Sequence, residues 1–173
     1  MKSIAGMSVL ITGGGSGIGR DCARRFCERG ARVTISGRRM DKLQAVKAEL
    51  GAQCEIVQGD VTVQADRETM LTAALHHGDG NLHALINNAA NMYRQPVDGY
   101  DEDFLKDAFN TNVVSAMMLS SMSVAPLERT EGAIVFIGST HTRRAFPGAS
   151  PYATTKAALE GLTKVMAAEL GPR

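Results

Sequence analysis

The chain has 173 residues, of which 44% are hydrophobic and 21% charged, and its formal net charge is +1. This length predicts a single domain over residues 1–173 with enough chain to bury a core. The hydrophobic content and balanced charge exclude a disordered protein, and they offer no basic patch for nucleic acid or an anionic membrane, so we expect neither as a partner.

The apolar stretches are no longer than a strand, and the first residues lack the long apolar segment of a secretion signal. Three cysteines, Cys22, Cys27 and Cys54, lack the spacing of zinc or redox motifs, which suits reduced thiols. His76 and His77 have no ligand partners at metal spacing, so no metal site is expected. We therefore expect a soluble, cytoplasmic protein.

Short apolar runs alternate along the chain with longer helical patterns. Continuous apolar runs are typical of strands that are buried on both faces of a parallel sheet. The predicted strands are 8–11, 32–36, 55–57, 84–86 and 133–137, and the predicted helices are about 18–29, 40–50, 63–77, 101–124 and 152–170. Gly30 and Gly51 follow the first two helices, where a left-handed cap is favoured. Repeated β–α units with right-handed crossovers predict an α/β fold with a doubly wound parallel sheet.

A glycine-rich turn, Thr12-Gly13-Gly14-Gly15-Ser16-Gly17-Ile18-Gly19, joins the first strand to the first helix. Gly13, Gly17 and Gly19 have the spacing that lets the backbone approach a pyrophosphate and lets the helix pack closely on the sheet. The helix N-terminus adds a partial positive charge for phosphates. A flexible loop is the alternative, but the position of the turn between a strand and a helix favours a dinucleotide site.

The second predicted strand ends at Arg38 and Arg39, where NAD-binding sheets usually present an acidic residue to the ribose hydroxyls. No acid stands there, and Asp41 is expected to begin the next helix. Either arginine can instead pair with a 2′-phosphate in a forked geometry, and two solvated surface charges are the alternative. We expect NADP(H) as the preferred cofactor and keep NAD(H) as the second option.

Ser139 follows the fifth predicted strand, at the carboxyl edge where open α/β sheets bind ligands. Tyr152 and Lys156 stand four positions apart near the start of the last helix, so they share one helical face. A neighbouring ammonium favours the ionised form of a phenol, which predicts Tyr152 as a proton donor and acceptor near neutral pH. Ser139 would hold the substrate oxygen during hydride transfer. A tyrosine stacked on the lysine stem is the alternative.

In combination, these residues resemble the short-chain dehydrogenase/reductase family. The matching motifs are, in chain order, Thr12-Gly-x-x-x-Gly-x-Gly19, Gly59-Asp60-Val61, Asn87-Asn88-Ala89-Ala90, Asn112, Ser139 and Tyr152-x-x-x-Lys156. Their order and their spread over the whole chain argue against coincidence. The resemblance implies a Rossmann-type sheet with strand order 3-2-1-4-5 and NAD(P)-dependent interconversion of a ketone or an aldehyde and an alcohol.

The resemblance also implies a role for each site residue. Tyr152 would be the acid/base, Ser139 would orient the substrate, Lys156 would bind the ribose and modulate Tyr152, and Asn112 would bind a water that links Lys156 to solvent. The implied cofactor contacts are Thr12, Gly13, Gly15, Ser16, Gly17, Ile18, Gly19, Arg38, Arg39, Asp60, Val61, Asn88, Ala89, Ala90, Tyr152 and Lys156.

Within that set, Asp60 and Val61 would contact the adenine ring, and residues 88–90 would lie beneath the cofactor. Two features depart from the family pattern. Ala90 stands where the family usually has glycine, and Arg173 ends the sequence before the sixth and seventh strands, the proline-glycine segment and the substrate lid that family members carry. We therefore expect an open edge at the fifth strand, no nicotinamide floor, and a truncated product or partial chain.

Two functions of different classes stay open. The first is an NADP-preferring oxidoreductase acting on a small carbonyl or alcohol substrate. The second is a nucleotide-binding remnant without turnover that acts through cofactor binding or dimerisation. The resemblance implies a homodimer or homotetramer, because the helices that carry Asn112 and Tyr152 commonly form a subunit contact. His141, Arg143 and Arg144 are expected to line the substrate entrance or to be solvated loop residues.

Overall fold

Five parallel strands form one sheet in the order β3-β2-β1-β4-β5 in the computed structural model, which describes residues 3–173. The strands are β1 (Ser8–Thr12), β2 (Arg32–Gly37), β3 (Cys54–Gln58), β4 (Ala84–Asn87) and β5 (Ala133–Phe136). Thr12 of β1 is in register with Ser36 of β2, and Ile11 of β1 is in register with Ile86 of β4. The carboxyl ends of these three strands therefore meet at one edge, and the predicted doubly wound order is confirmed.

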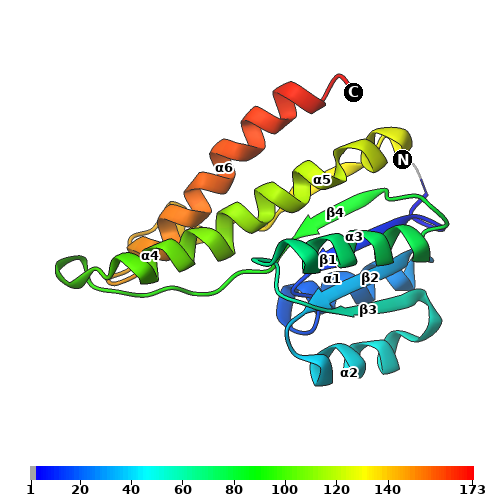
Figure 1. Cartoon of the computed structure of the whole chain (residues 1–173), viewed down its shortest axis with the longest axis horizontal. Helices are drawn as coiled ribbons and strands as arrows, with labels where there is room; N and C mark the ends of the chain where they lie inside the picture. Colours follow the sequence, from blue (N-terminus) through cyan, green and yellow to red (C-terminus); the bar gives the residue numbers. More distant parts are fainter. Residues whose placement is uncertain (1–2) are drawn as a thin grey trace.

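Helices lie on both faces of the sheet (Figure 1). The helices are α1 (Gly17–Glu28), α2 (Met40–Leu50), α3 (Gln64–His77), α4 (Glu102–Phe109), α5 (Ser115–Thr130) and α6 (Ser150–Leu170). The short helical turns are η1 (Gly51–Gln53), η2 (Val97–Gly99), the π-helical turn η3 (Asn110–Val114) and η4 (Thr140–Thr142). In Figure 1, α4 projects beyond the sheet on the left, and α6 begins beside it.

The core consists of two layers separated by the sheet. Successive strand residues point to opposite faces, so Val9 and Ile11 of β1 pack with α1 and α2, whereas Leu10 packs with α3 and α5. Every residue of β1 is buried, as the continuous apolar run predicts. Both faces of the central strands are covered, and open α/β sheets bind ligands at the carboxyl ends of their strands.

The predicted helix 101–124 is present but differs in two respects. It contains the π-helical turn η3 between α4 and α5, and α5 continues through Pro126 to Thr130. Proline removes one backbone donor without ending the helix here, and the helix stops instead at Glu131, which has a left-handed backbone (φ 50°). The other predicted elements match to within one or two residues.

Among the five strands of the described residues, β5 forms one edge of the sheet, and its Val135 is 41% exposed. Within residues 3–173, no helix combines the length and apolar character needed to cross a bilayer. The same part of the chain holds no group of three or more His, Cys, Asp or Glu side chains placed to bind a metal ion. Cys22, Cys27 and Cys54 are free thiols.

Candidate active site

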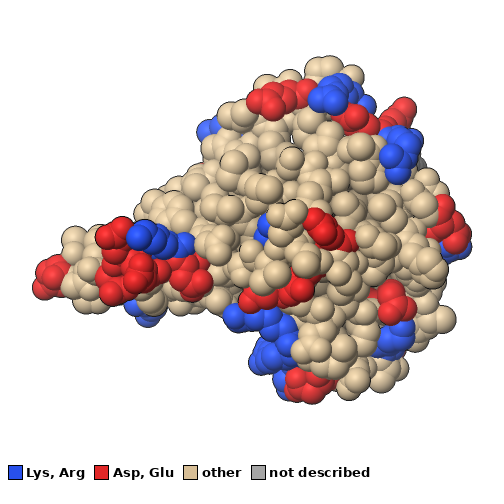
Figure 2. Space-filling model, viewed as in Figure 1, with Lys and Arg blue, Asp and Glu red and all other residues tan. Residues whose placement is uncertain are grey.

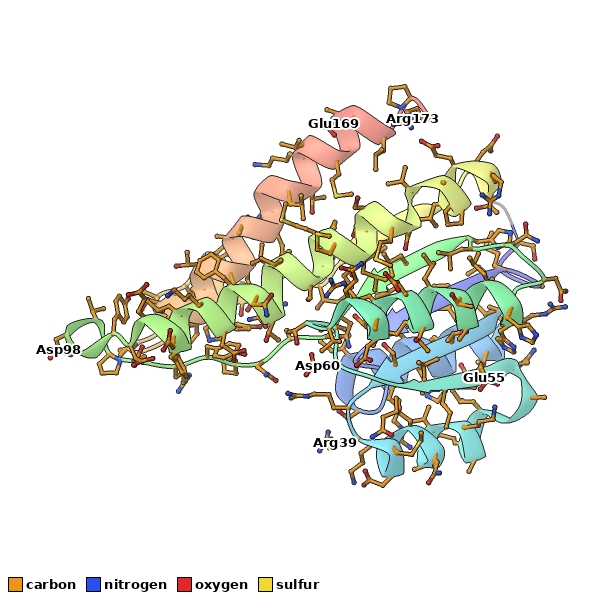
Figure 3. The ribbon with its side chains drawn as sticks, in the orientation of Figure 1. Arg39, Glu55, Asp60, Asp98, Glu169 and Arg173 are labelled. Carbon is orange, nitrogen blue, oxygen red and sulfur yellow. The ribbon has the colours of Figure 1, made fainter. Side chains whose placement is uncertain are left out.

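A cavity of about 550 Å³ opens at the carboxyl ends of the central strands. Figure 3 labels Arg39 and Asp60 at this end of the sheet. The cavity is lined by Gly13, Gly15, Ser16, Ile18, Gly37, Arg38, Arg39, Lys42, Leu43, Gly59, Asp60, Val61, Asn88, Ala89, Ala90, Asn91 and Thr111. Most of the predicted cofactor residues therefore surround one space, whereas Thr12, Gly17, Gly19, Tyr152 and Lys156 do not line it.

The glycines of the turn allow close approach between the first helix and the fourth strand. A Cβ atom on Gly19 would lie 2.5 Å from Asn88 Nδ2 and 2.5 Å from the carbonyl oxygen of Gly13. Gly13 has a left-handed backbone (φ 67°), and its Cβ would lie 2.9 Å from the same amide nitrogen. Neither position can hold a side chain without moving the backbone, so the turn is built around missing Cβ atoms.

Two side chains fasten the turn to the end of β4. The Nδ2 amide of Asn88 donates to the carbonyl oxygens of Thr12 (2.9 Å) and Gly13 (3.1 Å). In return, Thr12 Oγ1 accepts from the backbone N–H groups of Asn88 (3.1 Å) and Ala89 (3.0 Å). Thr12 and Asn88 thus shape the cavity floor, and Thr12 does so without lining the cavity.

The N-terminus of α1 faces the turn without a side-chain cap. Ser16 occupies the capping position with an extended backbone, but its side chain accepts no capping hydrogen bond, and the first turn of α1 contains no acidic residue. The first amide groups of a helix lack partners inside the helix and attract anions. Together with the space left by the missing Cβ atoms, these amides fit the pyrophosphate of a dinucleotide.

Charged side chains line the cavity at the ends of β2 and β3. Arg38, Arg39 and Lys42 line it, and Arg38 Nη1 lies 3.9 Å from Asp60 Oδ2. Burial raises the pKa of Asp60, but hydrogen bonds from the backbone N–H and hydroxyl of Thr62, together with the charge of Arg38, outweigh it, so the pKa lies below its ordinary value. Asp60 is therefore ionised at neutral pH, near Arg38.

The residues Ser139, Tyr152 and Lys156 come from the end of β5 and the first turns of α6. Lys156 is buried, its Nζ donates to the carbonyl oxygen of Ile137 (2.8 Å), and the same atom lies 5.8 Å from the centre of the Tyr152 ring. Burial lowers the pKa of Lys156. The ammonium thus lies near the phenol ring, and its hydrogen bond goes to the backbone just after β5.

The side chain of Asn112 is fully engaged with protein groups. Its Oδ1 accepts from the backbone N–H of Asn91 (2.9 Å), and its Nδ2 donates to the carbonyl oxygen of Asn91 (3.0 Å) and to Thr155 Oγ1 (3.1 Å). Asn112 lies in η3, and π-helical turns occur often at functional sites. Its amide therefore joins the loop after β4 to α6, next to Lys156.

Several polar residues of this network were not predicted as site residues. Tyr93 is buried; its hydroxyl contacts Asp107 Oδ2 (2.5 Å) and Thr111 Oγ1 (3.1 Å). Burial, and then the hydrogen bond to Asp107, raises the pKa of Tyr93. Asn91 and Thr111 line the cavity and also belong to this network. These contacts join segments that are separate in the sequence, so no local sequence motif indicates them.

Comparison with known proteins decides the family. A family model described as short chain dehydrogenase matches residues 7–173. The chain belongs to the short chain dehydrogenase family. Membership places it among oxidoreductases that act on CH–OH groups, as the names of similar proteins also indicate.

Among curated members of the short chain dehydrogenase family, gluconate 5-dehydrogenase of Gluconobacter oxydans (strain 621H) is 33% identical, over 98% of this chain and 67% of its own length. D-erythrulose reductase of Gallus gallus is 33% identical, over 98% of this chain and 68% of its own length. A crystal structure of a short chain dehydrogenase from Bacillus anthracis str. 'Ames Ancestor' superposes with a TM-score of 0.90 at 30% identity, over 99% of this chain and 71% of that one. The chain thus spans about two thirds of these relatives.

Proposed function

We propose that this chain carries the cofactor-binding and proton-transfer parts of an NAD(P)-dependent oxidoreductase that interconverts a ketone or an aldehyde and an alcohol. One observation carries the proposal. The ammonium of Lys156 is buried near the Tyr152 ring, and Tyr152 and Ser139 both contact the same residue, His141, beyond the carboxyl end of β5. An acid/base, a hydrogen-bond donor and a fixed cation are the groups that proton transfer to a carbonyl oxygen requires.

In the reductive direction, the Tyr152 hydroxyl gives its proton to the substrate oxygen, and in the oxidative direction it takes that proton back. The Ser139 hydroxyl donates a hydrogen bond to the same oxygen and fixes its position. Lys156 places a positive charge near the phenol ring. A bound nicotinamide cofactor would supply or accept the hydride.

The test is turnover of wild-type chain and of Tyr152→Phe with NADPH and a panel of ketones. The panel includes D-erythrulose and 5-ketogluconate, because relatives are named for D-erythrulose and gluconate. We expect Tyr152→Phe to lose at least about 10²-fold in kcat, as removal of an acid/base group does, at an unchanged Kd for NADPH. Equal rates for the two proteins would contradict the proposal, as would NADPH binding without oxidation across the panel.

NADP(H) is proposed as the preferred cofactor, since Arg38, Arg39 and Lys42 line the cavity where a 2′-phosphate would lie. We expect Arg38→Asp to lower the affinity for NADPH by about tenfold relative to NADH, because one charge-assisted contact with a phosphate is lost. Fluorescence titration with both cofactors measures the ratio. An unchanged ratio would mean that Arg38 is a solvated surface charge with no contact to the cofactor. Arg29→Asp, at the end of α1, is the charge-matched control.

A homodimer or homotetramer is proposed from the apolar surface of the outer helices. Phe109, Val114, Met117, Met118 and Val165 are each 38–54% exposed, and Figure 2 shows a broad uncharged surface over α5 and α6. Apolar patches of this kind mark contacts with other proteins.

A location in a reducing cytoplasm is proposed as well, because all three cysteines are free thiols.

A further inference from the structure

The side chain of His141 lies between Ser139 and Tyr152. Its Nδ1 is 3.2 Å from Ser139 Oγ, and its backbone N–H donates to the same oxygen at 3.2 Å. The imidazole stacks on Phe146, with ring centres 4.3 Å apart, and meets the Tyr152 ring at 89° with centres 5.3 Å apart. The ring is therefore held by three neighbours in one orientation.

The other ring nitrogen, Nε2, is buried and has no hydrogen-bond partner. The two neutral tautomers of the ring differ in whether this atom or Nδ1 carries the hydrogen. With the hydrogen on Nε2, a buried N–H donor would have no acceptor, and orphaned N–H groups are rare in folded proteins. With the hydrogen on Nδ1, the unpartnered atom carries only a lone pair, and the N–H points at Ser139 Oγ. The geometry therefore favours the Nδ1–H tautomer.

This tautomer determines how the Ser139 hydroxyl can bond. A serine oxygen accepts two hydrogen bonds and donates one. When the backbone N–H and the ring Nδ1–H of His141 occupy both acceptor positions, the hydroxyl hydrogen is left to point away from the histidine. In the opposite tautomer, the hydroxyl would donate to Nδ1 and would have no hydrogen left for a ligand.

We propose that His141 is a positioning residue that makes the Ser139 hydroxyl an obligate donor toward the substrate oxygen. This inference rests on the proposed function, in which that oxygen receives its proton from Tyr152. With Ser139 restricted to donation, two O–H groups converge on one oxygen, which suits a carbonyl and the negative charge that develops on it during reduction. A substrate hydroxyl that needed an acceptor at Ser139 would be bound less well.

The first test reads the tautomer without any turnover. Long-range ¹H–¹⁵N spectra of the full chain at pH 8 resolve the four histidines, and His141→Asn identifies the signal to follow. We expect Nδ1 of His141 to carry the hydrogen, and Ser139→Ala to shift the ring toward the other tautomer. A wild-type ring with its hydrogen on Nε2 would overturn the inference.

The second test is kinetic and uses D-erythrulose with NADPH. Removal of a donor that touches an oxyanion costs about 10²–10³-fold in kcat, so we expect a smaller, roughly tenfold loss for His141→Leu at an unchanged Kd for NADPH. His141→Asn should recover most of the rate, since its amide N–H can replace Nδ1–H. Equal rates for the Leu and Asn variants would overturn the inference. A wild-type chain that showed the Nδ1–H tautomer but no turnover would contradict the proposed function instead.

Discussion

The cofactor cavity and the proton-transfer region are built by different means. Around the cavity, the decisive features belong to the backbone: missing Cβ atoms at Gly13 and Gly19, and the uncapped amides of α1. In the proton-transfer region, they are side-chain hydrogen bonds, such as those of Asn112. A side chain added at a glycine of the turn therefore acts by steric overlap, whereas removal of a hydrogen-bonding side chain, in the network or at Thr12, acts by leaving polar groups without partners.

This difference explains why the cofactor cavity is easier to predict from the sequence than the proton-transfer region. The spacing of the glycines lies within one short stretch of the sequence, so it can be recognised there directly. Asn112 and Thr155 meet across 43 positions of the chain, and their contact depends on how α6 packs beside η3. Variants in the two regions test this comparison, because they should differ in both the size and the kind of their effect.

The largest effect is expected for Gly19→Ala, because its Cβ would overlap backbone and amide atoms at 2.5 Å. Overpacking of this kind costs about 1–3 kcal/mol, so we expect the free energy of unfolding to fall by about that amount and NADPH affinity to fall at least tenfold. Urea unfolding and fluorescence titration measure the two quantities.

The matched control is Gly161→Ala in the middle of α6, where a Cβ would meet no atom within 4 Å. Alanine is the better helix former, so this variant should gain about 0.5–1 kcal/mol. If both alanine variants changed stability in the same direction, the steric account of the turn would be refuted.

An intermediate effect is expected for Thr12→Val, which keeps the shape of the side chain but removes Oγ1. The N–H groups of Asn88 and Ala89 then lose their acceptor, and an unsatisfied buried donor costs about 1–3 kcal/mol. We expect the free energy of unfolding to fall by about 2 kcal/mol, within that range. Thr12→Ser, which retains the hydroxyl, should stay close to wild type, and a serine variant as unstable as the valine variant would argue against this role.

The smallest effect is the pH dependence that Lys156 contributes. Burial lowers its pKa below the ordinary value of 10.5, so between the two values the unfolded chain binds more protons than the folded one, and stability rises with pH in that window. We expect the free energy of unfolding of the wild-type chain to rise relative to that of Lys156→Met as the pH approaches 10.5. Chemical unfolding at several alkaline pH values measures it, and a constant difference would contradict the assignment.

The strands can be predicted from the sequence pattern, and the family resemblance adds their order and most of the cavity. Strands such as β1 are continuous apolar runs because both of their faces are buried, and that pattern is directly readable. Lys42 and Leu43 line the cavity but were not predicted. Their place on the first turn of α2 depends on how that helix packs, which no motif encodes.

The interruption of the long helix could not be predicted from the residues 110–114. Asn, Thr and Val have similar helix propensities, so nothing local distinguishes a π-helical turn from an α-helical one. Pro126 has the opposite character, since it is a strong local signal for a helix end, yet α5 continues past it because its buried face packs against the sheet. Tertiary packing decides both cases.

The π-helical turn η3 has a consequence for insertions and deletions in this chain. Each residue of a helix advances the side chains by about 100°, so the wider turn sets the faces of α4 and α5 out of phase with one continuous helix. Loss of a single residue between 110 and 114 could restore regular helix while rotating Asn112 away from Thr155. The circular dichroism spectrum would hardly change, although the hydrogen bond between Asn112 and Thr155 would be lost. Length, as much as composition, is therefore constrained at this point.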